Sequence, residues 1–284
     1  MSLDYEVLIS DPIPQSIKEL VPNGDRRMFS PISSTLIYGS DDAVLVDPPL
    51  TVDQTAAIGD RIERSGKRLT HIFATHGHAD HWFGAGPLSK RFPGARVVAS
   101  AGTIAQMRVH ADPDFRARFW DRLFPGQLPD SPVSAETVSG NRFQLEGHDL
   151  VIVEVGHSDT DDTSVLHVPD LGLVVAGDVI YNGVHQYLAE SADGGLDAWL
   201  AAIDRVEQLG ARHITAGHKD AGLDDDAGRA IAETRRYLLD ARELLAVHAS
   251  AEDFFHAMLE RHPSRLNAGA LWNGASTLYR RGGA

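Results

Sequence analysis

Short apolar runs and longer helical patterns alternate along the first part of the chain. The stretch 32–47 (ISSTLIYGSDDAVLVD) contains two apolar runs around a polar Gly-Ser-Asp-Asp turn, which predicts a β-hairpin. A helical pattern covers 51–64, and Gly66 ends it before the apolar run at 69–75. This run predicts a strand that leads directly into His76.

The rest of the chain contains further apolar runs, several of which end in a polar residue. Short apolar runs between turn signals are typical of buried strands, whereas longer segments with a period of 3.6 predict helices. In chain order, the pattern predicts an edge strand near 5–9, a short helix through 88–92, a strand at 95–99, a helix over 103–123, a loop over 124–139, strands at 149–155, 163–168 and 171–178, and a helix over 196–209.

The C-terminal part of the chain changes character after its last strand signal. The run at 211–218 (ARHITAGH) predicts a strand that ends in a histidine, and strand signals are absent beyond it. Two helical patterns, at 227–248 and 252–261, precede a tail that contains Gly and Asn. We therefore predict one domain over 1–222 and a C-terminal helical extension over 223–284 that packs on it.

The composition is that of an ordinary globular protein. Of the 284 residues, 43% are apolar and 23% are charged, which differs from the composition of disordered chains. The absence of cysteine excludes disulfides, thiolate metal ligands, iron–sulfur clusters and cysteine nucleophiles. The first residues do not match a secretory signal, and no apolar run approaches the ~18 residues of a membrane helix. We expect a cytoplasmic protein with no membrane partner.

The net charge bears on the partners of the protein. The formal charge is −14 at pH 7. Because a nucleic acid is bound by a basic face, this charge argues against a nucleic-acid partner. It suits a site that holds cations and accepts a small-molecule substrate. A homodimeric assembly stays open.

The densest chemical motif is the segment 75–81 (THGHADH), which places four metal-ligand side chains directly after a predicted strand. Imidazole and carboxylate groups suit zinc, iron or manganese, and a tight loop can direct alternate side chains at two ions. The alternative is a polar surface loop in which Asp80 caps a helix. That alternative leaves three further ligand-type residues near strand ends unexplained, although each alone is a weak signal. These three are His157, Asp178 and His218.

The motif THGHADH resembles the HxHxDH signature of the metallo-β-lactamase superfamily, and the later ligand-type residues follow in that family's order. The resemblance covers roughly residues 30–220. It implies an α+β fold, an αββα sandwich of two mixed β-sheets flanked by helices, with a two-metal centre. By their positions in the motif, His76, His78 and His157 would hold the first ion, Asp80, His81 and His218 would hold the second, and Asp178 would bridge both.

Two positions near the expected ligands bear on how these are oriented. Metal-binding histidines usually donate their second N–H to a carboxylate or carbonyl. Asp47 matches an aspartate that the family often has after the first hairpin, and a turn cap before Pro48 explains it equally well. Residues 160–163 (TDDT) either orient His157 or form a polar turn, and the turn is the favoured interpretation.

The segment after Asp178 is expected to leave its strand beside the metals and to line the pocket. It carries Tyr181, His185 and Tyr187, each able to donate a hydrogen bond to a substrate oxygen. Packing in the core is the alternative for each of these three residues.

The expected cofactors are two divalent ions, zinc first, with iron or manganese as alternatives. Such a pair shares a hydroxide that would act as the nucleophile, with Asp80, Asp178 and His218 in catalytic roles. Because the chain has no cysteine and has Asp178, it is more similar to the glyoxalase II and lactonase branches than to true β-lactamases. We therefore expect hydrolysis of a small ester, thioester or lactone. The alternatives are an iron-dependent redox enzyme of the same fold, a small-molecule phosphodiesterase and a non-catalytic metal-bound sensor.

Overall fold

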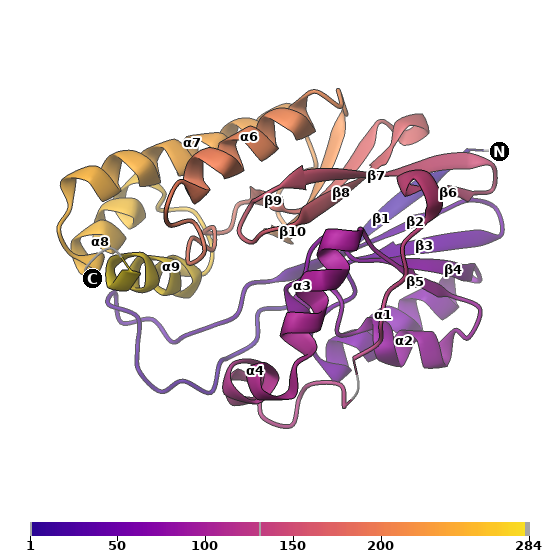
Figure 1. Ribbon diagram of the computed structural model, residues 1–284, viewed down its shortest axis with the longest axis horizontal. Coiled ribbons are helices and arrows are strands. Elements are labelled where there is room, and N and C mark those ends of the chain that lie inside the picture. Colours follow the sequence, from indigo (N-terminus) through magenta and orange to yellow (C-terminus); the bar gives the residue numbers. More distant parts are fainter. Residues whose placement is uncertain (1, 131, 282–284) are drawn as a thin grey trace.

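Two five-stranded β-sheets lie face to face in the computed structural model, which describes residues 2–130 and 132–281 (Figure 1). Both sheets are mixed: β3–β4, β4–β5 and β9–β10 pair in parallel, and the other neighbours are antiparallel. The first sheet contains, in spatial order, β1 (Asp4–Ser10), β2 (Ile32–Tyr38), β3 (Asp42–Val46), β4 (Arg68–Phe73) and β5 (Arg96–Val98). The second contains β10 (His213–Lys219), β9 (Leu173–Asn182), β8 (Thr163–Val168), β7 (His148–Gly156) and β6 (Arg142–Leu145).

Helices cover the outer faces of the two sheets (Figure 1). No helix in the described part of the chain has the length and apolar character needed to span a membrane. The helices beside the first sheet are α1 (Val52–Ser65), α2 (Ala85–Arg91), α3 (Ala101–Ala111), α4 (Pro113–Arg118) and α5 (Trp120–Leu123). Those beside the second sheet are α6 (Gly195–Glu207), α7 (Ala227–Val247), α8 (Ala251–Arg261) and α9 (Ala268–Arg281).

The central strands are buried on both faces, which explains their nearly continuous apolar sequences. Along β3, Val44 and Val46 belong to the apolar cluster between the sheets, together with Leu166 of β8. The alternate residues, Ala43 and Leu45, belong to the cluster under the helices of the first sheet. This alternation separates the core into layers in the order helix, sheet, sheet, helix. The predicted α+β class and αββα sandwich are therefore confirmed.

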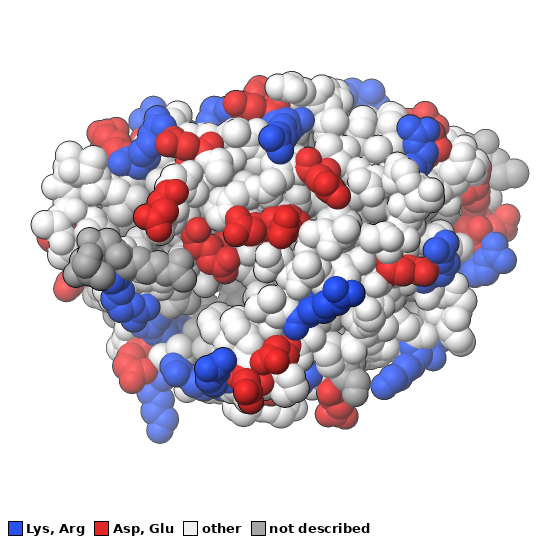
Figure 2. Space-filling model, viewed as in Figure 1, with Lys and Arg blue, Asp and Glu red and all other residues white. Residues whose placement is uncertain are grey.

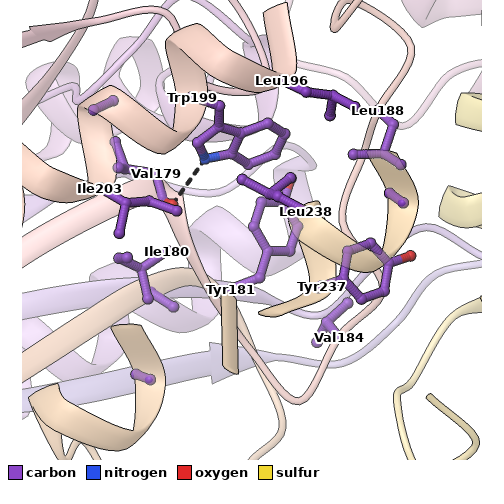
Figure 3. Packing of buried hydrophobic residues seen from close by; sticks show 14 of the residues in the cluster. Val179, Ile180, Tyr181, Val184, Leu188, Leu196, Trp199, Ile203, Tyr237 and Leu238 are labelled. Carbon is purple, nitrogen blue, oxygen red and sulfur yellow. Dashed lines mark hydrogen bonds between the residues drawn. The ribbon is translucent and has the colours of Figure 1, made fainter. Parts of the chain in front are cut away.

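The second sheet and the C-terminal helices share one apolar core (Figure 3). Trp199 of α6 and Leu238 of α7 pack there, and the indole N–H of Trp199 donates to the carbonyl of Val179 at 2.9 Å. Buried residues of α8 and α9, among them Phe255 and Leu271, belong to the same cluster. The C-terminal helices are thus packed on the second sheet, while a domain boundary after residue 222 stays a prediction.

The predicted strands are all present, together with β6, which the apolar pattern missed. The single helix predicted over 103–123 is wrong, because Pro113 has no N–H to continue α3 and begins α4 instead. The Gly- and Asn-containing tail of the predicted helical extension forms α9, for which the sequence had indicated no separate helix. Leu271, Ala275 and Leu278 of α9 are buried at helical spacing, a pattern that the intervening Gly and Asn residues obscured.

Candidate metal centre

The four ligand-type residues of the THGHADH motif lie on a buried turn after β4, which ends in the 3-10 helix η1 (Ala79–His81). None of the four exposes more than 7% of its surface. Gly77 allows the turn to lie against α3, because a Cβ at this position would collide with Gln106. The motif therefore presents its polar groups to the interior and is not a polar surface loop.

Asp47, directly after β3, holds this turn in place. Its Oδ1 accepts a hydrogen bond from the Thr75 amide (2.9 Å), and its Oδ2 accepts one from the Thr75 hydroxyl (2.8 Å). Oδ2 also lies 3.1 Å from Nδ1 of His81. The φ of Asp47 is 54°, which is strained for a residue other than glycine, and these contacts hold it there. The structure thus places Asp47 where it orients His81.

A second group of ligand-type residues converges between the two sheets. Nε2 of His218 lies 3.4 Å from Oδ2 of Asp80 and 3.2 Å from Oδ2 of Asp178. Nε2 of His81 lies 3.2 Å from Oδ2 of Asp80 and 3.4 Å from Oδ1 of Asp178. The ligand atoms of His76, His81 and Asp178 also lie within 4.8 Å of one another. Because Asp178 adjoins His218 on one side and His76 on the other, it has the position that a bridging carboxylate needs.

Four histidines of the centre are each held by one ring nitrogen, which leaves the other for an ion. Nε2 of His76, Nε2 of His81 and Oδ1 of Asp178 are buried and have no hydrogen-bond partner. Buried polar atoms without partners are costly, and a divalent cation bound among them would remove that cost. The holding contacts are Nδ1 of His76 to the Thr75 hydroxyl (3.0 Å), Nδ1 of His81 to Asp47 (3.1 Å), Nε2 of His78 to Glu190 (3.0 Å) and Nδ1 of His218 to the Pro31 carbonyl (2.8 Å).

The buried charges shift the pKa values of these groups. Burial lowers the pKa of His76 well below its usual range. Burial opposes the charge of His81 as well, but Asp80 and Asp178 outweigh it and raise its pKa well above the usual range. At His218, burial is likewise outweighed, chiefly by Asp178, and the pKa rises to about 10. In the metal-free protein, His81 and His218 are therefore protonated at neutral pH.

This protonation predicts that metal uptake releases protons at pH 7.5. A histidine binds an ion only in its neutral form, so the protons on His81 and His218 must leave when metal enters. The release should decline as the pH rises toward about 10, where His218 has already lost its proton. The measurement is a zinc titration of the metal-free protein with a pH indicator in weak buffer. Uptake of zinc at pH 7.5 without proton release would contradict this assignment, and metal-loaded protein serves as the control.

His157 is the predicted ligand that lies outside the three described groups of converging ligand atoms. Its Nδ1 lies 2.7 Å from Oδ1 of Asp161. Its ring lies against the start of α6, where a Cβ on Gly195 would be 2.9 Å from Nε2. Gly156 has a φ of 88° at an irregularity in the β7–β8 pairing, which redirects the chain just before His157. Its Nε2, like those of His76 and His81, is buried and has no hydrogen-bond partner, and its place beside the first ion stays a prediction.

Asp159, in the same loop, lies beside His76 and His78. It is fully buried, and its Oδ2 lies 2.8 Å from Nδ1 of His78 and 3.9 Å from Nε2 of His76. Burial raises the pKa of Asp159 to about 6, although His78 acts in the opposite direction. Of the neighbouring segment 160–163, Asp161 is the residue that contacts His157. The loop thus brings a carboxylate to the first pair of histidines.

A family model described as the metallo-beta-lactamase superfamily matches residues 27–218, more than half of the chain. The chain belongs to the metallo-β-lactamase superfamily. A metallo-beta-lactamase family protein from Thermus thermophilus has a similar structure, with a TM-score of 0.65 and 22% identity, over 99% of this chain and 94% of that one. A metallo-beta-lactamase from Pontibacter korlensis has a TM-score of 0.58 and 20% identity, over 83% of this chain and all of that one.

A curated relative is similar in sequence over a shorter stretch. The hydroxyacylglutathione hydrolase of Rhizobium meliloti (strain 1021) is 27% identical over 123 residues. These residues are 43% of this chain and 38% of the relative. The chain therefore matches well under half the length of that relative.

In this metallo-β-lactamase superfamily member, Tyr181 contacts Asp178, the carboxylate that lies between the two groups of ligand atoms. Strand β9 does not end at Asp178 but continues to Asn182, so Tyr181 is still in the sheet. Its exposed fraction is 1%, and its hydroxyl donates a hydrogen bond to Oδ2 of Asp178 at 2.5 Å. Burial and the nearby Asp178 raise the pKa of Tyr181 well above its usual range. The hydroxyl therefore keeps its proton and acts as a donor.

The other two expected substrate contacts differ from each other. His185 is fully buried, and its Nδ1 lies 3.0 Å from the Tyr237 hydroxyl. Packing against the C-terminal helices thus keeps His185 away from the centre, which corrects its expected role. Tyr187 is half-buried, and its ring centroid lies 5.8 Å from that of His78. It is the one of these two residues that adjoins the ligands.

Glu190 is a site residue that the sequence analysis did not single out. It lies between β9 and α6, with Oε1 at 3.0 Å from Nε2 of His78 and Oε2 accepting from the Thr160 hydroxyl at 2.8 Å. Its side chain is 37% exposed, so it forms part of the rim of the centre. A single glutamate in a loop belongs to no ligand motif, and the fold alone brings it to His78. Asp159 had a weak signal, since it lies in the loop that contains His157.

Glu190→Gln is predicted to weaken binding of the first ion by roughly 10–100-fold, the usual cost of losing a carboxylate that orients a histidine ligand. The amide has no negative charge to hold the Nε2 proton of His78. Competition with a chromogenic chelator measures the affinity of each ion. Glu260→Gln, an exposed residue of α8, is the matched control. Equal affinities in the wild type and Glu190→Gln would show that Glu190 does not orient His78.

Proposed function

We propose that this protein is a dinuclear-metal hydrolase that cleaves a small ester, thioester or lactone. The observation that carries the proposal is the position of Asp178 between His76 and His218. Two sets of converging ligand atoms joined by one carboxylate suit two ions that act on the same bond. The hydrolase named among the relatives supports this reaction class.

The donor set fits divalent ions, and we expect zinc, because imidazole nitrogens and carboxylate oxygens are its ordinary ligands. Asp80, His81 and His218 would hold one ion, and His76 and His78 would contribute to the other. When bound there, such ions would supply a hydroxide at neutral pH and polarise the substrate oxygen. Each of these four histidines has one ring nitrogen held by a neighbouring group, and this contact fixes the direction of the ring before an ion binds.

The residues of the chain around the ions then have distinct tasks. Asp178 aligns the two ligand groups, and the Tyr181 hydroxyl donates a hydrogen bond to Oδ2 of Asp178, with 2.5 Å between the two oxygens. That hydrogen bond occupies the one proton of the hydroxyl, so Tyr181 orients the carboxylate of Asp178 and does not contact the substrate. Tyr187 and Glu190, at the half-buried rim, would contact the part of the substrate that does not react.

A small substrate suits the charge and the depth of the centre. The ligands are almost completely buried, and Glu190 places a negative charge beside His78. Acidic and basic side chains are interspersed over the face shown in Figure 2, and several acidic ones lie near its middle. Such a surface does not favour a polyanion, because phosphate binding requires a concentrated positive charge. We therefore propose a small-molecule substrate rather than a nucleic acid.

The deciding experiment combines metal analysis with a substrate panel. Protein purified without added metal is analysed for zinc, iron and manganese, and ester, thioester, lactone and phosphodiester substrates are tested before and after chelation. We expect about two zinc ions per chain and hydrolysis of one of the first three classes, lost on chelation and restored by zinc. Iron without hydrolysis would replace this proposal with a redox reaction. Phosphodiester cleavage would reassign the substrate class, and bound metal with no turnover of the panel would indicate a sensor.

A further inference from the structure

His110 is a buried histidine beside the metal centre, and the proposed mechanism gives it no task. It lies in the last turn of α3 and exposes 8% of its surface. Its ring centroid is 5.2 Å from that of His78. Tyr187 and Glu190 adjoin the same ring of His78. His110, Tyr187 and Glu190 therefore form one rim of the centre around His78.

A hydrogen bond from Trp120, the first residue of α5, fixes where His110 carries its proton. The indole N–H of Trp120 donates to Nδ1 of His110 at 3.1 Å. Because an indole nitrogen can only donate, Nδ1 accepts with its lone pair, and the proton of the imidazole is on Nε2. Trp120 is itself buried, and the ring centroid of Phe115 lies 4.8 Å from that of His110. These neighbours hold the imidazole, so its N–H donor has a fixed direction.

This donor on Nε2 has no partner within the protein. No hydrogen bond in the described part of the chain involves Nε2 of His110, and the atom is accessible to solvent, in contrast to the buried Nε2 atoms of His76 and His81. A histidine that merely fills the core would bury this nitrogen against a protein acceptor. The N–H at the rim is thus available to a group that enters the site.

We infer that Nε2 of His110 donates a hydrogen bond to a neutral oxygen of the substrate, such as a carbonyl or amide oxygen, in the part that does not react. This inference deepens the proposed function and rests on it for the place of the substrate. The neutral ring has no charge to attract an anion, and the carboxylate of Glu190 beside His78 would repel one. A donor that is oriented before binding loses little conformational entropy when the substrate binds.

The first test observes His110 without any turnover. Zinc-loaded protein with nitrogen-15 in its histidines is studied by long-range proton–nitrogen NMR at pH 7.5, and the signals absent from His110→Leu identify His110. We expect a neutral ring with its proton on Nε2 in the wild type, and a mixture of tautomers in Trp120→Phe, which lacks the indole N–H. Addition of δ-valerolactam, a neutral amide analogue of a lactone, should shift the Nε2 signal until it saturates. A wild-type ring protonated on Nδ1, or an Nε2 signal that the lactam does not shift, overturns the inference.

The second test compares variants that differ in this donor. His110→Leu removes the N–H and keeps an apolar side chain, whereas His110→Gln keeps an N–H at a similar reach. His256→Leu, at an exposed histidine of α8, is the matched control. In His110→Leu, the Kd of δ-valerolactam and the KM of the hydrolysed panel substrate should rise roughly 3–10-fold, the usual effect of losing one neutral hydrogen bond, with kcat nearly unchanged. His110→Gln should recover most of this loss, and His256→Leu should equal the wild type.

Other results give His110 a purely structural role. Wild-type Kd and KM in His110→Leu, or no recovery in a folded His110→Gln, would do so. Circular dichroism and thermal unfolding establish that each variant folds, and if His110→Leu does not fold, the wild-type tautomer and lactam shift decide alone. Both NMR results are independent of turnover. A wild type that binds the lactam at His110 and hydrolyses no substrate would therefore contradict the proposed function and not this contact.

Discussion

Asp178→Asn is expected to lower kcat/KM by more than about 10³-fold and to reduce the metal content well below two ions per chain. Removing a residue that merely orients a ligand costs roughly 10–100-fold, and Asp178 touches both ligand groups. The amide keeps the shape of the side chain but has no negative charge to balance two divalent ions. It also removes the carboxylate that raises the pKa of His218. Elemental analysis and steady-state kinetics on the substrate identified by the panel measure the two effects.

The matched control for this variant is Asp197→Asn, an exposed carboxylate of α6 that pairs with Arg242. It should keep both ions and full activity. Asp178→Asn also removes the acceptor of the Tyr181 hydroxyl, so thermal unfolding must show that the variant folds. Two bound ions with full activity in the folded Asp178→Asn variant would refute the bridging position.

Gly217→Ala is expected to disrupt the centre without changing any polar group. Gly217 lies in β10 directly before His218, and a Cβ there would collide with Oδ1 of Asp178 and lie 2.7 Å from Cε1 of His81. Both neighbours are buried and held by other contacts, so neither has room to move away. Overpacking of this kind costs about 1–3 kcal/mol of the free energy of unfolding. Chemical denaturation of the metal-free protein measures this cost, and metal analysis measures the loss of ions.

Gly94→Ala is the matched control, because a Cβ on Gly94 meets no atom within 4 Å. We expect its stability to be unchanged or slightly higher, and its metal content to equal that of the wild type. If Gly217→Ala kept wild-type stability and two ions, the close approach of β10 to Asp178 and His81 would be wrong.

Local sequence was sufficient for the described strands other than β6 and for the region of the site. The alternation of apolar residues depends on burial, and burial of both faces of β3 and β9 produced the runs that predicted them. The HxHxDH spacing placed His76, His78, Asp80 and His81 together because neighbouring residues in one turn stay close in any fold. The prediction of one helix over 103–123 failed because Pro113 separates α3 from α4.

Side-chain direction and long-range contacts were decided only in the folded chain. Asp159 and His157 lie in one polar loop, and Asp159 is the one whose Oδ2 contacts His78, with its Oδ1 held by the Ser158 hydroxyl. Glu190 reaches His78 across 112 positions of the chain. His185 is directed into the core because the C-terminal helices pack there and supply Tyr237 as its partner. A motif fixes which groups are near one another along the chain, whereas packing fixes where each one points.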